Sequence, residues 1–158
     1  MPGHPPGQEV ALLEPEDITF LERQRVAHLA TADAGGRPAV VPVCFARLGA
    51  RLYVPVDAKP KRGDPRRLAR LRHLRARPEA VLLVDHYSED WGALRWLMIR
   101  ATAQILEAGA EREAALAALE GRYPQYAAMG LAGLGLPVIR LQPTTVRRWA
   151  AEPGVRRG

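Results

Sequence analysis

The fold of this chain is decided by residues 26–57, which read VAHLATADAGGRPAVVPVCFARLGARLYVPVD. Three apolar segments are separated here by two tight-turn sequences, DAGG at 33–36 and LGAR at 48–51. The last segment alternates apolar and polar residues, which is typical of a half-buried strand. Short turns of this kind join antiparallel neighbours. The sequence therefore predicts an antiparallel meander of three strands, at 26–31, 39–46 and 51–57, in which Pro42 favours an edge position or a bulge.

The rest of the chain is expected to add three strands and three helices. The strands are expected at 80–87, 94–106 and 138–149, the last interrupted near Pro143, and the helices at 15–22, 64–77 and 111–122. This order favours an α+β, mainly β domain: a six-stranded antiparallel barrel with helices packed outside. We expect a flexible N-terminal arm at 1–14, the barrel domain at 15–150 and a C-terminal tail at 151–158.

Composition places the chain among ordinary globular domains. It has 158 residues, 47% hydrophobic and 25% charged, which excludes a disordered or fibrous protein. Its single cysteine, Cys44, can form neither an internal disulfide nor a cysteine-based zinc site, and is expected to be a small apolar strand residue. No apolar run approaches the roughly 18 residues that span a membrane, and the N-terminus lacks signal-peptide features. A cytoplasmic protein without a membrane partner is expected.

The net charge of +6 is concentrated in one segment. Residues 59–77 contain nine basic residues and one acid, whereas the remainder of the chain is slightly acidic. Within the segment, Pro60 stiffens a turn that carries Lys59, Lys61 and Arg62 just before a helix, and this arrangement suits a phosphate. The alternatives are a solvated basic loop and a nucleic-acid partner. The absence of aromatic residues from 59–77 argues against nucleic acid, because bases stack on such residues.

The acidic stretch DHYSED at 85–90 suggests either a metal site or a serine nucleophile at Ser88. Neither has its usual partners, since no second histidine stands at metal-ligand spacing and no G-x-S-x-G motif surrounds Ser88. We therefore predict a polar turn between strands, no metal site, and no assignable catalytic residue. Trp91, Trp96 and Trp149 are expected either to pack in the core or to flank a planar ring near the anion site.

The chain resembles the pyridoxamine 5′-phosphate oxidase-like split-barrel proteins, and most of all their deazaflavin (coenzyme F-420)-dependent branch. The resemblance extends from about Arg25 to Trp149 and depends on the order and spacing of four segments. These are ATADAGGRPAVVPVCFA (30–46), RLYVPVDAKPKRG (51–63), RPEAVLLVDHYSEDW (77–91) and RYPQY (122–126). It implies the FMN-binding split-barrel fold and a homodimer with a flavin or deazaflavin in each of two clefts between subunits.

The resemblance also implies roles for individual residues. The cofactor phosphate would be held by Lys59, Lys61 and Arg62, and the ring would be lined by the backbone around Pro42, Val43 and Cys44. The cleft would be closed by Trp91, with Arg147 and Trp149 of the partner subunit. Because a deazaflavin carries a polyglutamate tail beyond its phosphate, the further cations Arg66, Arg67 and Arg70 favour deazaflavin over FMN.

The resulting expectation is an oxidoreductase that transfers a hydride to or from a small organic substrate, with the cofactor supplying the chemistry. Oxidation of pyridoxamine phosphate itself is not implied, because the substrate-phosphate residues of a true oxidase are not recognisable in 141–158. Two alternatives stay open: a protein that binds flavin or haem without turnover, and a small basic nucleic-acid-binding barrel.

Overall fold

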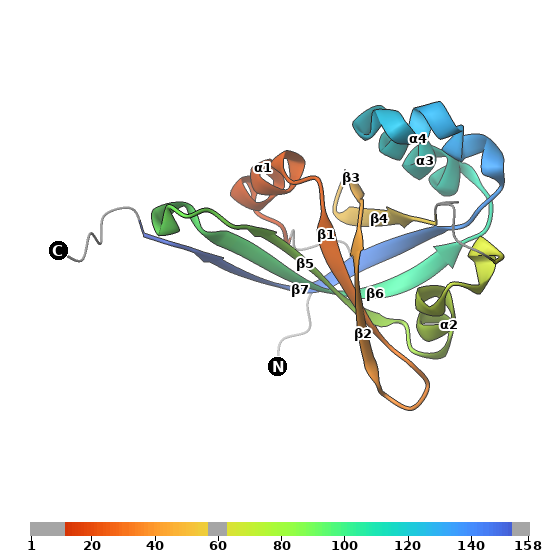
Figure 1. Cartoon of the computed structure of the whole chain (residues 1–158), viewed down its shortest axis with the longest axis horizontal. Coiled ribbons are helices and arrows are strands. Elements are labelled where there is room, and N and C mark those ends of the chain that lie inside the picture. Colours follow the sequence, from red (N-terminus) through yellow and green to blue (C-terminus); the bar gives the residue numbers. More distant parts are fainter. Residues whose placement is uncertain (1–11, 57–62, 153–158) are drawn as a thin grey trace, which may run out of the picture.

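The computed structural model describes residues 12–56 and 63–152, which form a single curled antiparallel sheet with helices around it (Figure 1). The strands are β1 (Ala27–Ala32), β2 (Pro38–Val43), β3 (Ala46–Leu48), β4 (Arg51–Pro55), β5 (Glu79–His86), β6 (Arg95–Leu106) and β7 (Val138–Ala150). They follow one another across the sheet in the order β2-β1-β5-β6-β7-β4-β3. This arrangement confirms the predicted mainly β split-barrel architecture.

The sheet has seven strands, so the prediction of six was wrong. The apolar run 39–46 divides at Cys44 and Phe45, which separate β2 from β3. These two strands lie at opposite edges of the sheet although only two residues join them. The short link therefore brings the edges together and curls the sheet. The edge position predicted for Pro42 is confirmed, since β2 is an edge strand.

The helices also differ in detail from the prediction. They are α1 (Pro15–Arg23), α2 (Ala69–Ala76), α3 (Ala110–Arg122) and α4 (Pro124–Met129), with 3₁₀ turns η1 (Pro65–Arg67), η2 (Trp91–Ala93) and η3 (Leu131–Leu134). The helix expected from residue 64 starts as η1, and α2 proper begins only after Leu68. Neither α4 nor η3 was expected. None of the helices in the described ranges has the length and apolar composition that crossing a membrane requires.

Two hydrophobic clusters hold the fold together. The larger lies between the inner face of the sheet and helices α1 and α2, and includes the fully buried Leu29, Leu82 and Leu97 on neighbouring strands. Burial of each such leucine contributes roughly 1.5–3 kcal/mol. The smaller cluster lies where α3 and α4 cover β3 and β4, at one end of the molecule (Figure 1). At the other end, the β5–β6 hairpin extends from the body beside β7.

An ion pair between a buried carboxylate and a partly exposed arginine fastens α1 to the sheet. The carboxylate of Asp17, in the first turn of α1, accepts a hydrogen bond from the Glu14 backbone N–H at 2.9 Å. It also accepts one from the Arg148 guanidinium of β7 at 2.8 Å. Burial alone would raise the pKa of Asp17, but these hydrogen bonds and the nearby charges of Arg148 and Arg95 outweigh it, so the pKa is lowered. The ionised form of Asp17 is therefore the one that stabilises the fold.

Candidate functional site

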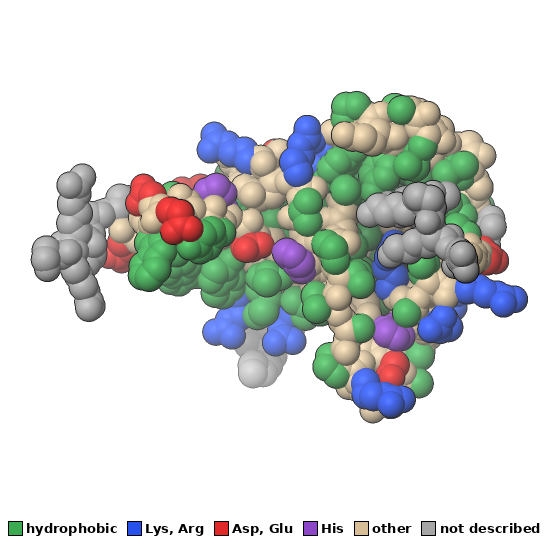
Figure 2. Space-filling view, viewed as in Figure 1, with side chains coloured by type: hydrophobic (Ala, Val, Ile, Leu, Met, Phe, Trp, Pro, Cys, Tyr) green, Lys and Arg blue, Asp and Glu red, His purple; other side chains and the backbone are tan. Residues whose placement is uncertain are grey.

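The strands present an outer face, opposite the larger cluster, that carries many apolar side chains. We call it the open face. It is formed by Pro38, Val40 and Pro42 of β2, His28, Ala30 and Ala32 of β1, Val81, Leu83 and Asp85 of β5, Trp96, Met98 and Arg100 of β6, and Arg147 and Trp149 of β7. The exposed fractions of Val40, Leu83 and Trp149 are 63%, 36% and 45%. Figure 2 shows hydrophobic side chains gathered over the hairpin and the middle of the molecule.

The predicted ring-lining segment lies at the end of β2. Pro42 is exposed and stands opposite His28 in the open face. Val43 is buried, and Cys44 is half-buried against the smaller cluster. In the described residues, β2 pairs only with β1, so the backbone at its other edge has no strand partner. Such an edge can donate and accept hydrogen bonds to a planar ligand that carries amide-like groups.

The predicted phosphate residues Lys59, Lys61 and Arg62 lie outside the described residues, and the side chain of Arg66 is not described either. Elsewhere in the basic segment, several arginines have structural partners. Arg77 donates to the carbonyls of Asp33 and Ala34 at 3.0 Å each, and so fixes the β1–β2 turn.

Arg75 faces Glu107 at 3.4 Å. Arg67 is exposed, with its carbonyl accepting a hydrogen bond from Arg72.

The predicted cleft-closing residues lie on the hairpin and on β7. Trp91 is 70% exposed in η2, at the hairpin tip. The tip is built by its own polar residues: the Asp90 side chain accepts from the Gly92 N–H at 3.1 Å, and the Ser88 hydroxyl accepts from the Asp90 N–H at 3.1 Å. Residues 87–90 thus form a polar turn, as predicted, whereas Asp85 and His86 still belong to β5. Trp149 lies opposite Trp96 across the β6–β7 pair.

One chain does not bring the ring-lining and closing residues together. Pro42 and Arg147 stand at the two ends of a single row across the open face, in which the intervening positions are His28, Leu83 and Met98. Neighbouring strands are about 4.8 Å apart, so four spacings separate the ends by about 19 Å along the sheet. A single chain therefore does not place both groups around one ring.

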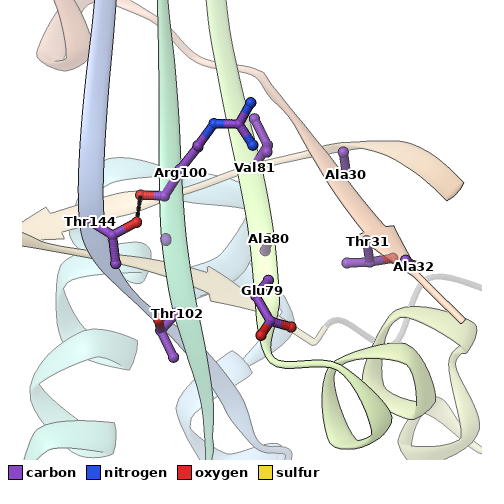
Figure 3. A pocket seen from close by; sticks show the side chains of 10 residues that line it. Ala30, Thr31, Ala32, Glu79, Ala80, Val81, Arg100, Thr102 and Thr144 are labelled. Carbon is purple, nitrogen blue, oxygen red and sulfur yellow. Dashed lines mark hydrogen bonds between the residues drawn. The ribbon is translucent and has the colours of Figure 1, made fainter. Parts of the chain in front are cut away.

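The open face also contains a groove of about 440 Å³, which was not among the predicted sites (Figure 3). Its walls are mostly small residues contributed by different strands, including Ala30, Ala32, Ala80 and Ala101. Arg100 extends over Val81 on one side of the groove, and its carbonyl accepts a hydrogen bond from the Thr144 hydroxyl at 3.2 Å. The groove becomes apparent only once the strands are paired, because its alanines are far apart in the sequence.

Comparisons with solved structures agree with this fold. A conserved protein from Mycobacterium tuberculosis, Rv2991, superposes with a TM-score of 0.71 at 17% identity, over 91% of this chain and 89% of that one. HutZ, the haem storage protein from Vibrio cholerae, superposes with a TM-score of 0.68 at 24% identity, over 87% of this chain and 94% of that one. An FAD-binding protein from Mesorhizobium loti superposes with a TM-score of 0.64 at 18% identity, over 84% of this chain and 91% of that one. At these identities the likeness establishes the fold alone.

Sequence comparison identifies the family more directly. No protein with a curated description shows significant similarity to the chain. The family model described as pyridoxamine 5′-phosphate oxidase, however, matches residues 13–150, which include every described strand and helix. The chain therefore belongs to the pyridoxamine 5′-phosphate oxidase family.

Proposed function

We propose that two copies of this chain form a dimer through their open faces and bind a flavin-type cofactor in each of two clefts between them. The cofactor then exchanges a hydride with a small organic substrate. The observation that supports this most is the separation of Pro42 from Arg147 and Trp149, which lie on the same face but on distant strands. A two-fold axis through the open face gives each copy's β2 edge a partner hairpin to close over it.

The apolar character of the open face supports the dimer. Monomeric proteins seldom expose large continuous apolar patches, and those that they do expose usually mark interaction sites. Here Val40, Leu83 and Trp149 are at least one-third exposed, on every second strand across the open face. A symmetric contact buries these side chains on both copies at once. It also covers the free edge of β2, which would otherwise be open to non-specific strand pairing.

The residues of the chain suit a flavin or a deazaflavin. The unpaired edge of β2 near Pro42 offers backbone groups to the carbonyl and N–H groups on the pyrimidine side of the ring. Trp91 and Trp149 provide exposed aromatic surface that can cover the ring and exclude water. The cations at Lys59, Lys61 and Arg62 carry charge suited to the phosphate. When bound, the cofactor supplies the hydride chemistry.

We favour a deazaflavin over FMN as the cofactor. FMN ends at its phosphate, whereas the deazaflavin continues into a tail with further carboxylates. Positive charge continues past the phosphate segment in this chain, with Arg66 and the exposed Arg67 in η1. This extension suits the longer anion.

Cys44 offers a direct test of cofactor binding, because it is the only cysteine in the chain. The purified protein is titrated with FMN and with deazaflavin, and the rate of Cys44 alkylation is measured with and without each one. We expect saturable binding of at least one cofactor and a several-fold slower alkylation in its presence. Absence of binding by both cofactors would contradict the proposal, as would binding that leaves Cys44 fully reactive.

Haem binding without turnover is a second candidate, favoured by one pair of residues on the open face. His28 Nδ1 lies 3.8 Å from Asp85 Oδ1, and a carboxylate beside an imidazole is the usual way that a metal-ligating histidine is oriented. If the chain binds haem here, haemin gives a Soret band that His28→Ala changes and His86→Ala leaves intact. A flavin-binding protein that gives no specific haemin spectrum would eliminate this candidate.

A further inference from the structure

The RYPQY segment at 122–126 has a structural role that links it to the candidate site. Arg122 ends α3, and Tyr123 separates α3 from α4. The ring of Tyr123 is 7% exposed and makes an edge contact with Tyr126, at 5.5 Å between centroids. Both side chains of the Arg122–Tyr123 pair are directed towards Phe45, in the two-residue link between β2 and β3.

The Tyr123 hydroxyl binds the backbone of Phe45 at both of its polar groups. The Phe45 N–H donates to this hydroxyl at 3.2 Å, and the Phe45 carbonyl lies 3.0 Å from it. The Arg25 carbonyl is a second acceptor for the Tyr123 hydroxyl, at 2.9 Å, and Arg122 Nε donates to the Tyr123 hydroxyl oxygen at 3.2 Å. A hydroxyl has a single proton, so Tyr123 donates to one of the two carbonyls at a time.

Arg122 holds the side chain of Phe45. Its guanidinium lies over the Phe45 ring, 4.9 Å from the centroid, and that ring is fully buried. The guanidinium is itself fixed by the end of α1: it donates to the Leu21 carbonyl at 3.0 Å and to the Glu22 carboxylate at 3.1 Å, and also to the Gln24 carbonyl. Phe45 is therefore fixed at its N–H, its carbonyl and its ring.

This anchoring matters because the link at Cys44 and Phe45 belongs to neither strand. Buried backbone groups need partners, and in a sheet these are normally supplied by the ladder. At Phe45 the Tyr123 hydroxyl takes that place. The predicted ring-lining residues are Pro42 and Val43, directly before the link, and Cys44 within it.

We propose that Tyr123, supported by Arg122, is a positioning residue: it fixes the segment 42–44 before the cofactor binds. This inference rests on the proposed function, and Tyr123 acts through Phe45 rather than by touching the cofactor. Loss of the hydroxyl leaves the ring in the cluster but frees the link between β2 and β3. The backbone that lines the cofactor ring then has to be ordered during binding, which weakens affinity.

The test compares Tyr123→Phe with a matched control, Tyr53→Phe. Tyr53 is also buried, and its hydroxyl donates to the Glu111 carboxylate at 2.8 Å, away from Phe45. Each variant loses one buried hydroxyl. For Tyr123→Phe we expect about 5- to 10-fold weaker cofactor binding, consistent with one lost hydrogen bond. We also expect an altered visible spectrum of the saturated complex and several-fold faster alkylation of Cys44 without cofactor.

Tyr53→Phe should match the wild type in all three measurements, even if it lowers thermal stability as much as Tyr123→Phe does. A Tyr123→Phe variant with wild-type affinity, spectrum and Cys44 reactivity would overturn the inference. If the wild type binds neither FMN nor deazaflavin, the proposed function fails, and the rate of Cys44 alkylation still decides whether Tyr123 holds the segment.

Hydrogen exchange at the Phe45 amide provides a second measurement if Tyr123→Phe does not fold. In the wild-type protein without cofactor we expect this amide to be protected at least 100-fold, with little change on binding. An amide that exchanges freely until the cofactor binds would show that the ligand, and not Tyr123, orders the link.

Discussion

Pro42 and Arg147 face the same side of the sheet at opposite ends of one row of paired residues, with three strands between them. The row contains His28, Leu83 and Met98, so its middle is largely apolar. An apolar centre flanked by a free strand edge and by an arginine suits a two-fold interface with ligand clefts at its margins.

The dimer should depend on Leu83, at the centre of the row. We expect the wild-type protein to sediment at twice the 17.4 kDa mass of the chain, and Leu83→Asp to sediment as a monomer. The reason is that the substitution places a desolvated charge in the middle of the interface.

Leu48→Asp is the matched control, since Leu48 is 37% exposed compared with 36% for Leu83 but lies on β3, away from the open face. Equal dimer dissociation constants for the two variants would contradict the proposed interface.

The choice of cofactor should be visible in the salt dependence of binding. We expect deazaflavin to bind more tightly than FMN and to lose affinity more steeply between 50 and 300 mM salt, because exposed charges are screened at higher ionic strength. Replacement of Arg66 and Arg67 by alanine should flatten the deazaflavin curve and leave the FMN curve unchanged. Titrations by fluorescence at both salt concentrations measure this. Tighter FMN binding, unaffected by the two arginines, would refute tail recognition.

Asp17 should make the fold acid-sensitive. Its pKa is lower in the folded protein than the usual 3.8, so its stabilising effect is complete above that value and is lost as the pH falls through the folded-state pKa. At pH 7, Asp17→Asn should cost about 1–2 kcal/mol, because the partly exposed Arg148 loses a charged hydrogen-bond partner but can still be hydrated.

Urea unfolding at pH 7 and at pH 3 tests this, with the exposed Glu16→Gln on the same helix as a control. The difference between wild type and Asp17→Asn should shrink at pH 3. A constant difference would mean that ionisation of Asp17 is not the source of its effect.

Local sequence patterns predicted most of the strands but not the break between β2 and β3. Alternation and turn residues marked 26–31 and 51–57 clearly, because the periodicity of a half-buried strand is a local property. The run 39–46 is apolar throughout, so nothing in it indicated that the chain would leave one sheet edge at Val43 and join the other at Ala46. That break results from closure of the sheet, which involves contacts far apart in the sequence.

Only separate parts of the candidate site could be proposed from the sequence. The basic segment around Lys59 was found from its charge, and Trp91 was one of three aromatic candidates to flank a ring, whereas Pro42 entered as a ring-lining residue only through the resemblance. That Pro42 and Arg147 share one row follows from strand order, which local patterns do not specify. The function of Tyr123 also lay beyond sequence reasoning, because its partner Phe45 is 78 residues away.

Subunit complementation tests directly whether the cofactor cleft is built from two chains. One variant carries Lys59→Ala and Lys61→Ala, and the other carries Trp91→Ala. Each should bind cofactor poorly alone. The lysine variant loses two charge-assisted hydrogen bonds, which contribute about 3–6 kcal/mol together, and the Trp91 variant loses aromatic surface that covers the ring. When equal amounts are unfolded together and refolded, half of the dimers are mixed and each has one intact cleft. We predict that tight binding returns at about a quarter of all sites. If no tight sites return, the lysines and Trp91 of one cleft come from the same chain, and the arrangement in which a partner hairpin closes over the cofactor is wrong.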